Sequence, residues 1–252
     1  MPGEFFTSDP VKIVAQKGEY LCLEIAFRGS MIPYHEESIL PVFEWKDGKW
    51  IPSKRVPFPG MIGCDRMVKK KIGFMGDSIT QGIGTPVNAY THWNALTAAA
   101  VGEEYSYWNL GLGYGRAQDA ASDSAWLYKA KHLDVVVVCY GTNDIGQGRT
   151  TEQMKADLHT IVSKLKAAGV KVIIQTLPPF DRKGELLEKW RDINCYIRNT
   201  LSAYADGMFD VVPYLLDGPE EEGKAGYGAH PDENGCLAWA NALIPYLQEF
   251  VK

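Results

Sequence analysis

The stretch KIGFMGDSIT, residues 71–80, decides how this sequence is expected to fold. Its first residues are mostly apolar, which is typical of a strand that is covered on both faces of a sheet. Gly76 and Asp77 then indicate a turn, so Ser78 is predicted at the carboxyl end of a parallel strand, where open α/β folds bind their ligands. A serine in this place is also a common helix cap, and the stretch alone favours capping over catalysis.

The composition describes a folded chain of ordinary size. It has 252 residues, of which 46% are hydrophobic and 23% are charged, close to the averages of globular proteins. The formal net charge is −5, and we interpret the short basic run 69–71 as a solvated lead-in to the strand. Nucleic acid or an anionic membrane surface would need a basic footprint, so we expect neither as a partner.

Cysteine usage and targeting signals favour a cytoplasmic protein. The five cysteines are widely spaced and contain no C-x-x-C pair, which predicts reduced and mostly buried thiols. The N-terminus has no basic region followed by an apolar core, and no segment reaches the roughly 18 consecutive apolar residues of a membrane span. We therefore expect cytoplasmic residence, although a secreted chain trimmed of its signal would look the same.

From about residue 70, apolar strand patterns alternate with helical patterns. Strands are predicted at 71–75, 105–110, 134–140, 170–176 and about 208–212, with helices between them and a last helix at the C-terminus. This alternation predicts a parallel sheet with helices on both faces. The clearest helix is expected over 151–168, where Thr150 and Gln153 can form a capping box.

The first 68 residues have a different pattern. Alternating apolar residues at 20–27 and the turn signal Asp47–Gly48, which lies between VFEW and KW, indicate a small antiparallel unit. The proline-rich stretch 56–60 marks its predicted join to the main domain. We therefore predict a β-rich extension over 1–68 and an α/β domain over 69–252.

Small and polar residues follow three of the predicted strands and precede the last helix. Ser78 follows the first strand, the glycine-rich run NLGLGYG at 109–115 follows the second, Asn143 follows the third, and His230 precedes the C-terminal helix. Because the carboxyl ends of parallel strands share one edge, these residues would converge. Acyl transfer needs such a set, namely a nucleophile, a base that takes its proton, and donors for the oxyanion.

In their order along the chain, these blocks resemble those of the GDSL or SGNH hydrolase family. The blocks are Gly76-Asp77-Ser78, a glycine of the second block, Gly141-Thr142-Asn143-Asp144 and His230-Pro231. The resemblance runs from about Lys71 to the C-terminus, and Ser8–Val11 with Lys17–Glu19 is similar to the β-rich extension of some bacterial members. It implies a flavodoxin-like three-layer α/β/α sandwich that hydrolyses an ester through an acyl-serine, with no cofactor and no metal.

Residue by residue, the resemblance implies four catalytic residues. Ser78 would be the nucleophile and His230 the general base. The oxyanion would be held by the backbone N–H groups of Ser78 and Gly113 and by the side-chain amide of Asn143. Gly115 is the alternative to Gly113, because the second block is one residue shorter than the family pattern.

Tyr227 departs from the family pattern D-x-x-H, which has an aspartate three residues before the histidine. A neutral phenol cannot stabilise an imidazolium as a carboxylate does. The sequence therefore predicts a Ser-His dyad in which a backbone carbonyl accepts the Nδ1 proton of His230. Asp217 and the run Glu220–Glu222 are the candidate substitutes for the aspartate.

The resemblance implies a serine esterase that removes acetyl or another short acyl group from a carbohydrate, and the sugar rests on analogy alone. Trp45, Trp50, Tyr34 and His35 could stack on a sugar, although aromatic residues of a small β unit more often form its core. The alternative is an SGNH-fold ligand-binding protein with little or no activity. A phosphate-binding glycine loop is weaker, because its G-x-G-x-x-G spacing is broken. The sequence leaves the natural acyl group, the alcohol and the oligomeric state open.

Overall fold

The computed structural model describes residues 9–16, 18–26, 28, 34–35, 37–57 and 63–252. The chain forms two compact units, residues 1–33 and 34–252. The described residues of the first unit contain no helix or strand, and most of their apolar side chains, such as Val14 and Tyr20, are exposed. A strand expected over 20–27 is therefore not found over 20–26, where no second segment of this unit pairs with the backbone groups. Ser8, Lys17 and Phe27 lie outside the described residues.

The second unit begins with the predicted hairpin. Strands β2 (Phe43–Lys46) and β3 (Lys49–Pro52) pair antiparallel, and Asp47 and Gly48 between them have φ values of 51° and 78°, as a two-residue hairpin turn requires. Trp45 lies opposite Trp50 with its ring edge-on at 5.3 Å, and the two side chains are 60% and 49% exposed. These tryptophans are thus not part of a core.

A second short ladder joins β1 (Tyr34–His35) to β4 (Val56–Pro57). It brings the segment before the hairpin next to the segment after it. The join expected at 56–60 falls partly on residues 58–60, which lie outside the described residues. The domain boundary between residues 68 and 69 therefore stays a prediction.

The main sheet is the predicted parallel one. Its strand order is β6-β5-β7-β8-β9, so the first strand along the chain lies between the second and the third, as in flavodoxin-like folds. In such a sheet, ligands bind where the order reverses, next to the first strand. The strands, in chain order, are β5 (Lys71–Gly76), β6 (Ser106–Gly111), β7 (Val135–Cys139), β8 (Lys171–Gln175) and β9 (Gly207–Phe209).

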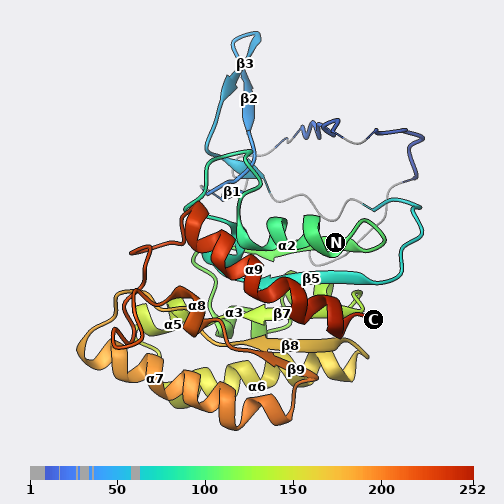
Figure 1. Ribbon diagram of the computed structural model, residues 1–252. Helices are drawn as coiled ribbons and strands as arrows, with labels where there is room; N and C mark the ends of the chain where they lie inside the picture. Colours follow the sequence, from blue (N-terminus) through green and yellow to red (C-terminus); the bar gives the residue numbers. More distant parts are fainter. Residues whose placement is uncertain (1–8, 17, 27, 29–33, 36, 58–62) are drawn as a thin grey trace. The chain divides into compact units, whose positions relative to one another are not determined.

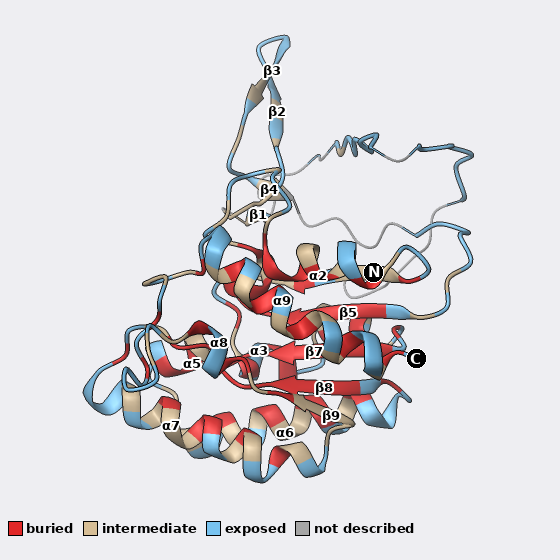
Figure 2. Cartoon of the chain, in the orientation of Figure 1, coloured by how far each residue is buried: buried red, intermediate tan, exposed pale blue. Residues whose placement is uncertain are grey.

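Helices cover both faces of the sheet, which makes three layers (Figure 1). Alternate residues of β7 point to opposite faces: Val135 and Val137 join one hydrophobic cluster, and Val136 and Val138 join the other. The three central strands β5, β7 and β8 are accordingly buried along most of their length, whereas the edge strands β6 and β9 are mostly half-buried (Figure 2). One face carries α2 (Trp93–Val101) and α9 (Glu233–Phe250), and the other carries α3 (Ala117–Ala121), α4 (Ala125–Ala130), α6 (Thr151–Ala167) and α7 (Gly184–Asn199).

Local sequence features explain where several helices and strands begin and end. Helix α6 begins at Thr151 with the expected capping box, in which Thr150 and Gln153 bond each other's backbone N–H groups. Strand β9 ends at Phe209 rather than near residue 212, because the short helix α8 (Val212–Leu215) begins there with a proline in its first turn. A 3₁₀ turn over Leu201–Ala203 connects α7 to β9.

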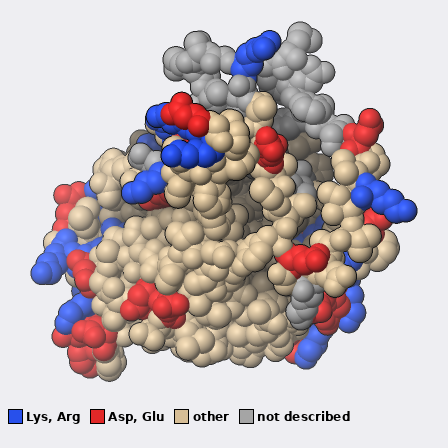
Figure 3. All heavy atoms as spheres, turned by 90° about the horizontal axis from the view of Figure 1, so that it is seen from above, with Lys and Arg blue, Asp and Glu red and all other residues tan. Residues whose placement is uncertain are grey.

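The cysteines are less buried than the sequence predicts. The five cysteines form no disulfide, and Cys139 and Cys236 are buried while the other three are exposed, so the expectation of mostly buried thiols is wrong. Across the described residues, no helix is long and apolar enough to cross a membrane. On the face shown in Figure 3, acidic and basic side chains are interspersed around the edge, and uncharged residues cover the middle.

Candidate active site

Ser78 is the first residue of the short helix α1 (Ser78–Gln81), which begins directly after β5. Asp77 caps this helix, because its Oδ1 accepts the N–H of Ile79 at 3.0 Å. Two side chains of α2 hold the same turn, since Trp93 donates to the carbonyl of Ile79 at 3.2 Å and Asn94 donates to that of Thr80. Asp77 rather than Ser78 is therefore the cap, and the hydroxyl of Ser78 is left for another partner.

That partner is His230. The Oγ of Ser78 lies 2.8 Å from Nε2 of His230, a hydrogen-bond distance across 152 positions of the chain. Gly84 is close to the histidine on one side, because a Cβ on this glycine would lie 2.9 Å from Cβ of His230 and 2.5 Å from the carbonyl oxygen of Pro231. The ring of Phe180 meets the imidazole edge-on at 5.8 Å.

The segment that carries His230 is fastened to the chain after β8. The N–H of Ala225 donates to Oδ1 of Asp181 at 2.8 Å, and the carbonyl of Gly223 accepts the N–H groups of Phe180 and Arg182 at 3.3 Å. The position of residues 180–182 therefore constrains the position of the segment 223–230, which ends at His230.

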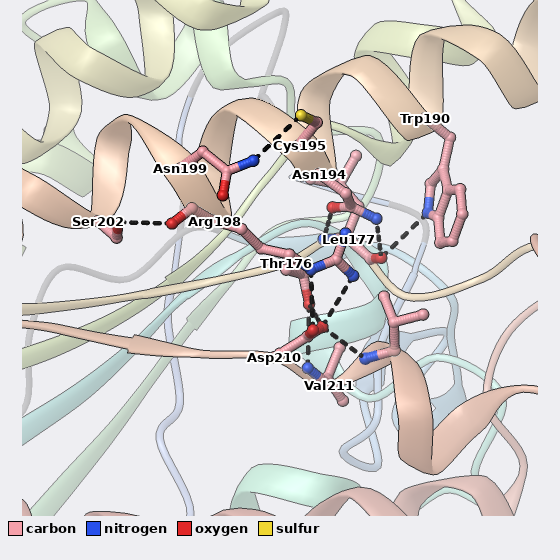
Figure 4. Close-up of polar contacts among 11 residues, drawn as sticks. Thr176, Leu177, Trp190, Asn194, Cys195, Arg198, Asn199, Ser202, Asp210 and Val211 are labelled. Carbon is pink, nitrogen blue, oxygen red and sulfur yellow. Dashed lines mark hydrogen bonds and ion pairs between the residues drawn. The ribbon is translucent and has the colours of Figure 1, made fainter.

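Helix α7 fixes the start of that supporting segment (Figure 4). The Oδ1 of Asn194 accepts the N–H of Leu177 at 2.7 Å, and its Nδ2 donates to the carbonyl of Leu177 at 3.0 Å. Trp190 donates to the same carbonyl at 3.0 Å. Beside it, Asp210 accepts from Thr176 and Arg198, which joins the ends of β8 and β9 to α7.

Asn143 reaches the site from α5 (Thr142–Gly146), which follows β7. Its Nδ2 donates to the carbonyl of Gly115 at 3.0 Å, and Gly115 donates its own N–H to Leu112 at 3.0 Å. An amide nitrogen carries two hydrogens, so the second N–H of Asn143 remains available to an oxyanion. Gly115 therefore orients Asn143, and its own N–H is used within the turn.

Gly113 also lies at this edge of the sheet, but its N–H is engaged. It donates to Oε1 of Gln81 at 2.7 Å. The Nε2 of the same side chain donates to the carbonyl of Glu37 at 3.1 Å. Gln81 thus links the glycine-rich turn after β6 to the segment after β1.

Tyr227 stands at the sequence position where the family pattern has an aspartate, and its side chain bonds to another partner than His230. Its hydroxyl donates to the carbonyl of Pro179 at 2.5 Å. Three of the candidate substitutes are paired: Asp217 and Glu221 with Lys224, at 2.9 and 3.8 Å, and Glu222 with Arg191 at 2.8 Å. Among the described residues, neither a carboxylate nor the expected backbone carbonyl accepts a hydrogen bond from Nδ1 of His230.

Burial shifts the pKa values of several ionisable groups around Ser78 and His230. It raises the pKa of Asp77 to about 7, and the nearby Asp144 acts in the same direction. It lowers the pKa of Arg182 to about 10. It also lowers the pKa of His230, and the negative charge of Glu37 opposes that shift. A neutral His230 at neutral pH is the form that can accept a proton from Ser78.

Sequence reasoning missed three residues of this site: Glu37, Gln81 and Phe180. Gln81 lies three residues after Ser78, so its place close to the Gly-Asp-Ser block carried a signal. Glu37 and Phe180 lie next to no motif, and nothing in their sequence context points to the site. His92, which directly precedes α2, is buried with its ring against Gly82.

Neither a metal-binding cluster nor the cavity described below involves the predicted catalytic residues. Among the residues that the structure describes, no group of three His, Cys, Asp or Glu side chains could hold a metal ion. A surface cavity of about 640 Å³ is lined by Trp190, Cys195 and Arg198 of α7 and by neighbouring residues, none of them a predicted catalytic residue.

Comparison with known proteins gives a family and a fold. The model of the GDSL-like lipase/acylhydrolase family matches residues 74–237. No curated protein matches the sequence. A member of the lipolytic protein G-D-S-L family from Veillonella parvula is similar in structure, with a TM-score of 0.55 and 20% identity over 69% of this chain and 96% of that one.

Two esterases have similar structures. A carbohydrate acetylesterase from Sinorhizobium meliloti has a TM-score of 0.56 and 17% identity over 72% of this chain and 99% of its own. The psychrotrophic esterase EstA from a Pseudoalteromonas species, in a structure inhibited by monoethylphosphonate, has a TM-score of 0.56 and 14% identity over 72% of this chain and 98% of its own. At these identities the similarity concerns the fold.

Proposed function

The chain belongs to the GDSL-like lipase/acylhydrolase family and is a carboxylic ester hydrolase, and we propose that it removes acetyl or another short acyl group from a carbohydrate through an acyl-Ser78 intermediate. The observation that carries the mechanism is the 2.8 Å contact between Oγ of Ser78 and Nε2 of His230. A neutral imidazole at this distance can take the hydroxyl proton as the oxygen attacks.

In the first half-reaction, Oγ of Ser78 bonds to the ester carbonyl carbon and its proton passes to Nε2 of His230. The tetrahedral intermediate then breaks its bond to the alcohol oxygen, which leaves with that proton. In the second half-reaction, His230 takes a proton from water, the hydroxide attacks the acyl group, and the proton returns to Ser78 as the acid departs. The steps need no group beyond the chain, the ester and water.

The oxyanion would be held by three donors. Ser78 is the first residue of α1, so its N–H has no acceptor within the helix. Asn143 supplies the second N–H of an amide that Gly115 already orients. Gly113 would be the third, and its N–H becomes available when the side chain of Gln81 turns away from it. Binding of the substrate would have to drive that turn.

Fewer observations support the proposed acyl group and the proposed alcohol. Similarity of fold to a carbohydrate acetylesterase favours a short acyl group on a sugar. The exposed faces of Trp45 and Trp50 offer aromatic surface of the kind on which sugar rings stack. These two features favour a sugar over a long-chain lipid alcohol.

Labelling with a fluorophosphonate tests the nucleophile. The reagent should modify the wild-type protein once, at Ser78, and leave Ser78→Ala unmodified. Ser163→Ala is the matched control, because Ser163 on α6 is an exposed serine whose Oγ lies 3.4 Å from Nδ1 of His159. An unlabelled wild-type protein would favour the ligand-binding alternative.

A panel of esters tests the substrate class. Acetylated xylose and glucose should release acetate faster than p-nitrophenyl octanoate releases nitrophenol, and p-nitrophenyl acetate should be an intermediate case. A preference for the octanoate would contradict both the short acyl group and the sugar. Equal rates for sugar acetates and ethyl acetate would support a preference for the acetyl group and contradict a preference for a sugar alcohol.

A further inference from the structure

Phe180 is in direct contact with the proposed base. Its ring meets the imidazole of His230 edge-on, with 5.8 Å between the ring centroids and 83° between the ring planes. Aromatic rings prefer this T-shaped arrangement, and the distance lies within its usual range. Phe180 is half-buried and also packs against the hydrophobic cluster that contains Trp93 and Trp239. The ring therefore connects the imidazole to the core of the domain.

The backbone around Phe180 is bonded to the segment that leads to His230. Residues 179–182 donate to or accept from residues 223–227 through the backbone N–H groups of Phe180 and Arg182, the carboxylate of Asp181 and the carbonyl of Pro179. The hydrogen bond to the Pro179 carbonyl comes from the hydroxyl of Tyr227. The residue that stands in place of the family's aspartate thus helps to fasten the neighbour of Phe180.

The guanidinium of Arg182 lies over the ring of Phe180, with its Cζ 5.5 Å from the ring centroid. This side chain is buried, donates one long hydrogen bond of 3.4 Å to the carbonyl of Thr142, and has an Nε that no acceptor among the described residues meets. An aromatic face attracts a cation that has lost its water. Arg182 therefore restricts how the ring of Phe180 can turn.

The imidazole of His230 has few other contacts that could orient it. Its Nε2 lies 2.8 Å from Oγ of Ser78, and among the described residues no acceptor meets its Nδ1. Gly84 lies close to Cβ of His230 and so limits the backbone rather than the ring. A single hydrogen bond does not fix the plane of an imidazole. Of the aromatic rings that the structure describes, Phe180 is the one that meets it.

From these contacts we propose that Phe180 is a positioning residue that holds the imidazole of His230 ready for proton transfer by packing, where the family pattern uses an aspartate, and that Arg182 holds Phe180 in turn. The proposal rests on the proposed role of His230 as general base. An aspartate orients the imidazole through a hydrogen bond and a charge, whereas an apolar ring orients it by contact. Such a ring also keeps water away, which favours the neutral imidazole. Burial is the main cause that lowers the pKa of His230, in agreement with this effect.

The titratable side chains around Phe180 and His230 come from the residues beside them, from the start of α1 and from the segment after β1. They are Asp181, Arg182, Tyr227, Asp232, Asp77 and Glu37. Of these, Glu37 alone is among the causes that shift the pKa of His230, and it opposes burial. Replacing Phe180 removes none of them. A change in the pKa of His230 in such a variant therefore reports the access of water to the imidazole.

The test is Phe180→Ala, which removes the ring. We expect kcat on p-nitrophenyl acetate to fall about tenfold to a hundredfold with KM nearly unchanged, because a small displacement of a catalytic group is costly. The pKa of His230 should rise, so the acidic limb of kcat/KM should move to higher pH. Loss of a carboxylate partner would move that limb to lower pH. Phe180→Tyr keeps the ring and should retain the wild-type limb and most of kcat.

Phe250→Ala is the matched control. Phe250 is also half-buried and packs against the same cluster, but its ring stacks on Tyr246 at 6.3 Å. This variant should lose comparable stability and keep the wild-type limb and kcat. An effect of Phe180→Ala confined to KM, a limb that moves to lower pH, or an equal loss of kcat in Phe250→Ala would overturn the proposal.

A double-mutant cycle tests the part assigned to Arg182. Arg182→Ala should lower kcat about threefold to tenfold in the wild-type background but add little to Phe180→Ala, because Arg182 acts through that ring. Equal losses in the two backgrounds would show that Arg182 acts through Thr142 and would overturn this part.

The pKa of His230 can also be followed by NMR of its ring protons, which needs no turnover. A higher pKa in Phe180→Ala, with the wild-type value in Phe180→Tyr and Phe250→Ala, supports the packing whatever the substrate proves to be. A lower or unchanged pKa in Phe180→Ala would overturn it. A wild-type protein that hydrolyses no ester would contradict the proposed function, and this measurement would still decide whether Phe180 covers the imidazole.

Discussion

The two ends of the Ser78–His230 pair are built in opposite ways. Ser78 lies in a buried turn whose cap, Asp77, is its sequence neighbour and whose braces, Trp93 and Asn94, come from the next helix. His230 is only partly buried, and the groups that contact it come from the chain after β8 and from the loop at Gly84. A serine that is held by neighbouring residues depends on its local motif. A histidine that is held by distant segments can keep its place when the residues that support it differ.

The sharpest test of this comparison removes each end in turn. Ser78→Ala and His230→Ala should each lower kcat on p-nitrophenyl acetate by a factor on the order of 10⁴ to 10⁶, and the double variant should lose little more, because the two act as one unit. The matched control is the exposed pair on α6, and Ser163→Ala with His159→Ala should retain full activity. Additive losses at positions 78 and 230 would show that the two ends act separately.

Asn143 tests the side of the site that follows β7. Asn143→Ala should lower kcat by about 10² to 10³ and change KM little, because an oxyanion donor acts mainly in the transition state. Asn199→Ala, which removes an exposed amide from the end of α7, should leave both constants unchanged. An effect on KM alone would make Asn143 a binding residue.

Asp77 tests how strongly the nucleophile turn is constrained. Its pKa is raised from 3.8 to about 7 on folding, so the folded state binds the proton more tightly and the free energy of unfolding falls as pH rises between these values. Asp77→Asn keeps a capping side chain and removes the charge, and it should gain about 1–3 kcal/mol over wild type at pH 8 but little at pH 4.

Denaturant unfolding at the two pH values measures this difference. The control is Asp232→Asn, an exposed cap at the start of α9, which should show no comparable pH-dependent gain. An Asp77→Asn variant that is less stable than wild type at pH 8 would mean that the carboxylate is ionised and well solvated in the folded protein.

The smallest effect is expected on the histidine side. Tyr227→Phe removes the hydroxyl that donates to Pro179 and should lower the free energy of unfolding by about 1 kcal/mol. Tyr214→Phe is the control, since Tyr214 is 53% exposed. A large loss of kcat in Tyr227→Phe with unchanged stability would assign the phenol a direct part in catalysis.

Much of the sheet could be predicted because its strands are covered on both faces. A run such as Val135–Val138 contains only apolar side chains, which is the pattern of a strand that is buried on both faces. The strand expected at 20–27 was predicted from alternating apolar residues alone. Such a strand forms only if a second strand pairs with it, and the sequence does not indicate which segment that would be. The expectation for the tryptophans failed for a related reason, since a two-stranded hairpin has two faces and no core.

The site could be predicted where motif and strand end coincide. Ser78, Asn143 and His230 were expected from their blocks, and the structure brings the serine and the histidine into contact. The engagement of Gly113 by Gln81 depends on a side-chain conformation that no pattern encodes. Glu37 reaches the site through a two-residue ladder between β1 and β4, and so short a pairing leaves no periodic signal in the sequence.

The separation of 152 positions between Ser78 and His230 also affects when the proposed catalytic pair can form during synthesis of the chain. His230 directly precedes α9, and Trp239 of that helix stacks on Trp93 of α2 at 4.6 Å, beside the turn of the nucleophile. A nascent chain lacks this contact until α9 has left the ribosome, so a sheet that is already folded would still present Ser78 without its proposed base. The proposed pair therefore forms only after α9 has been synthesised.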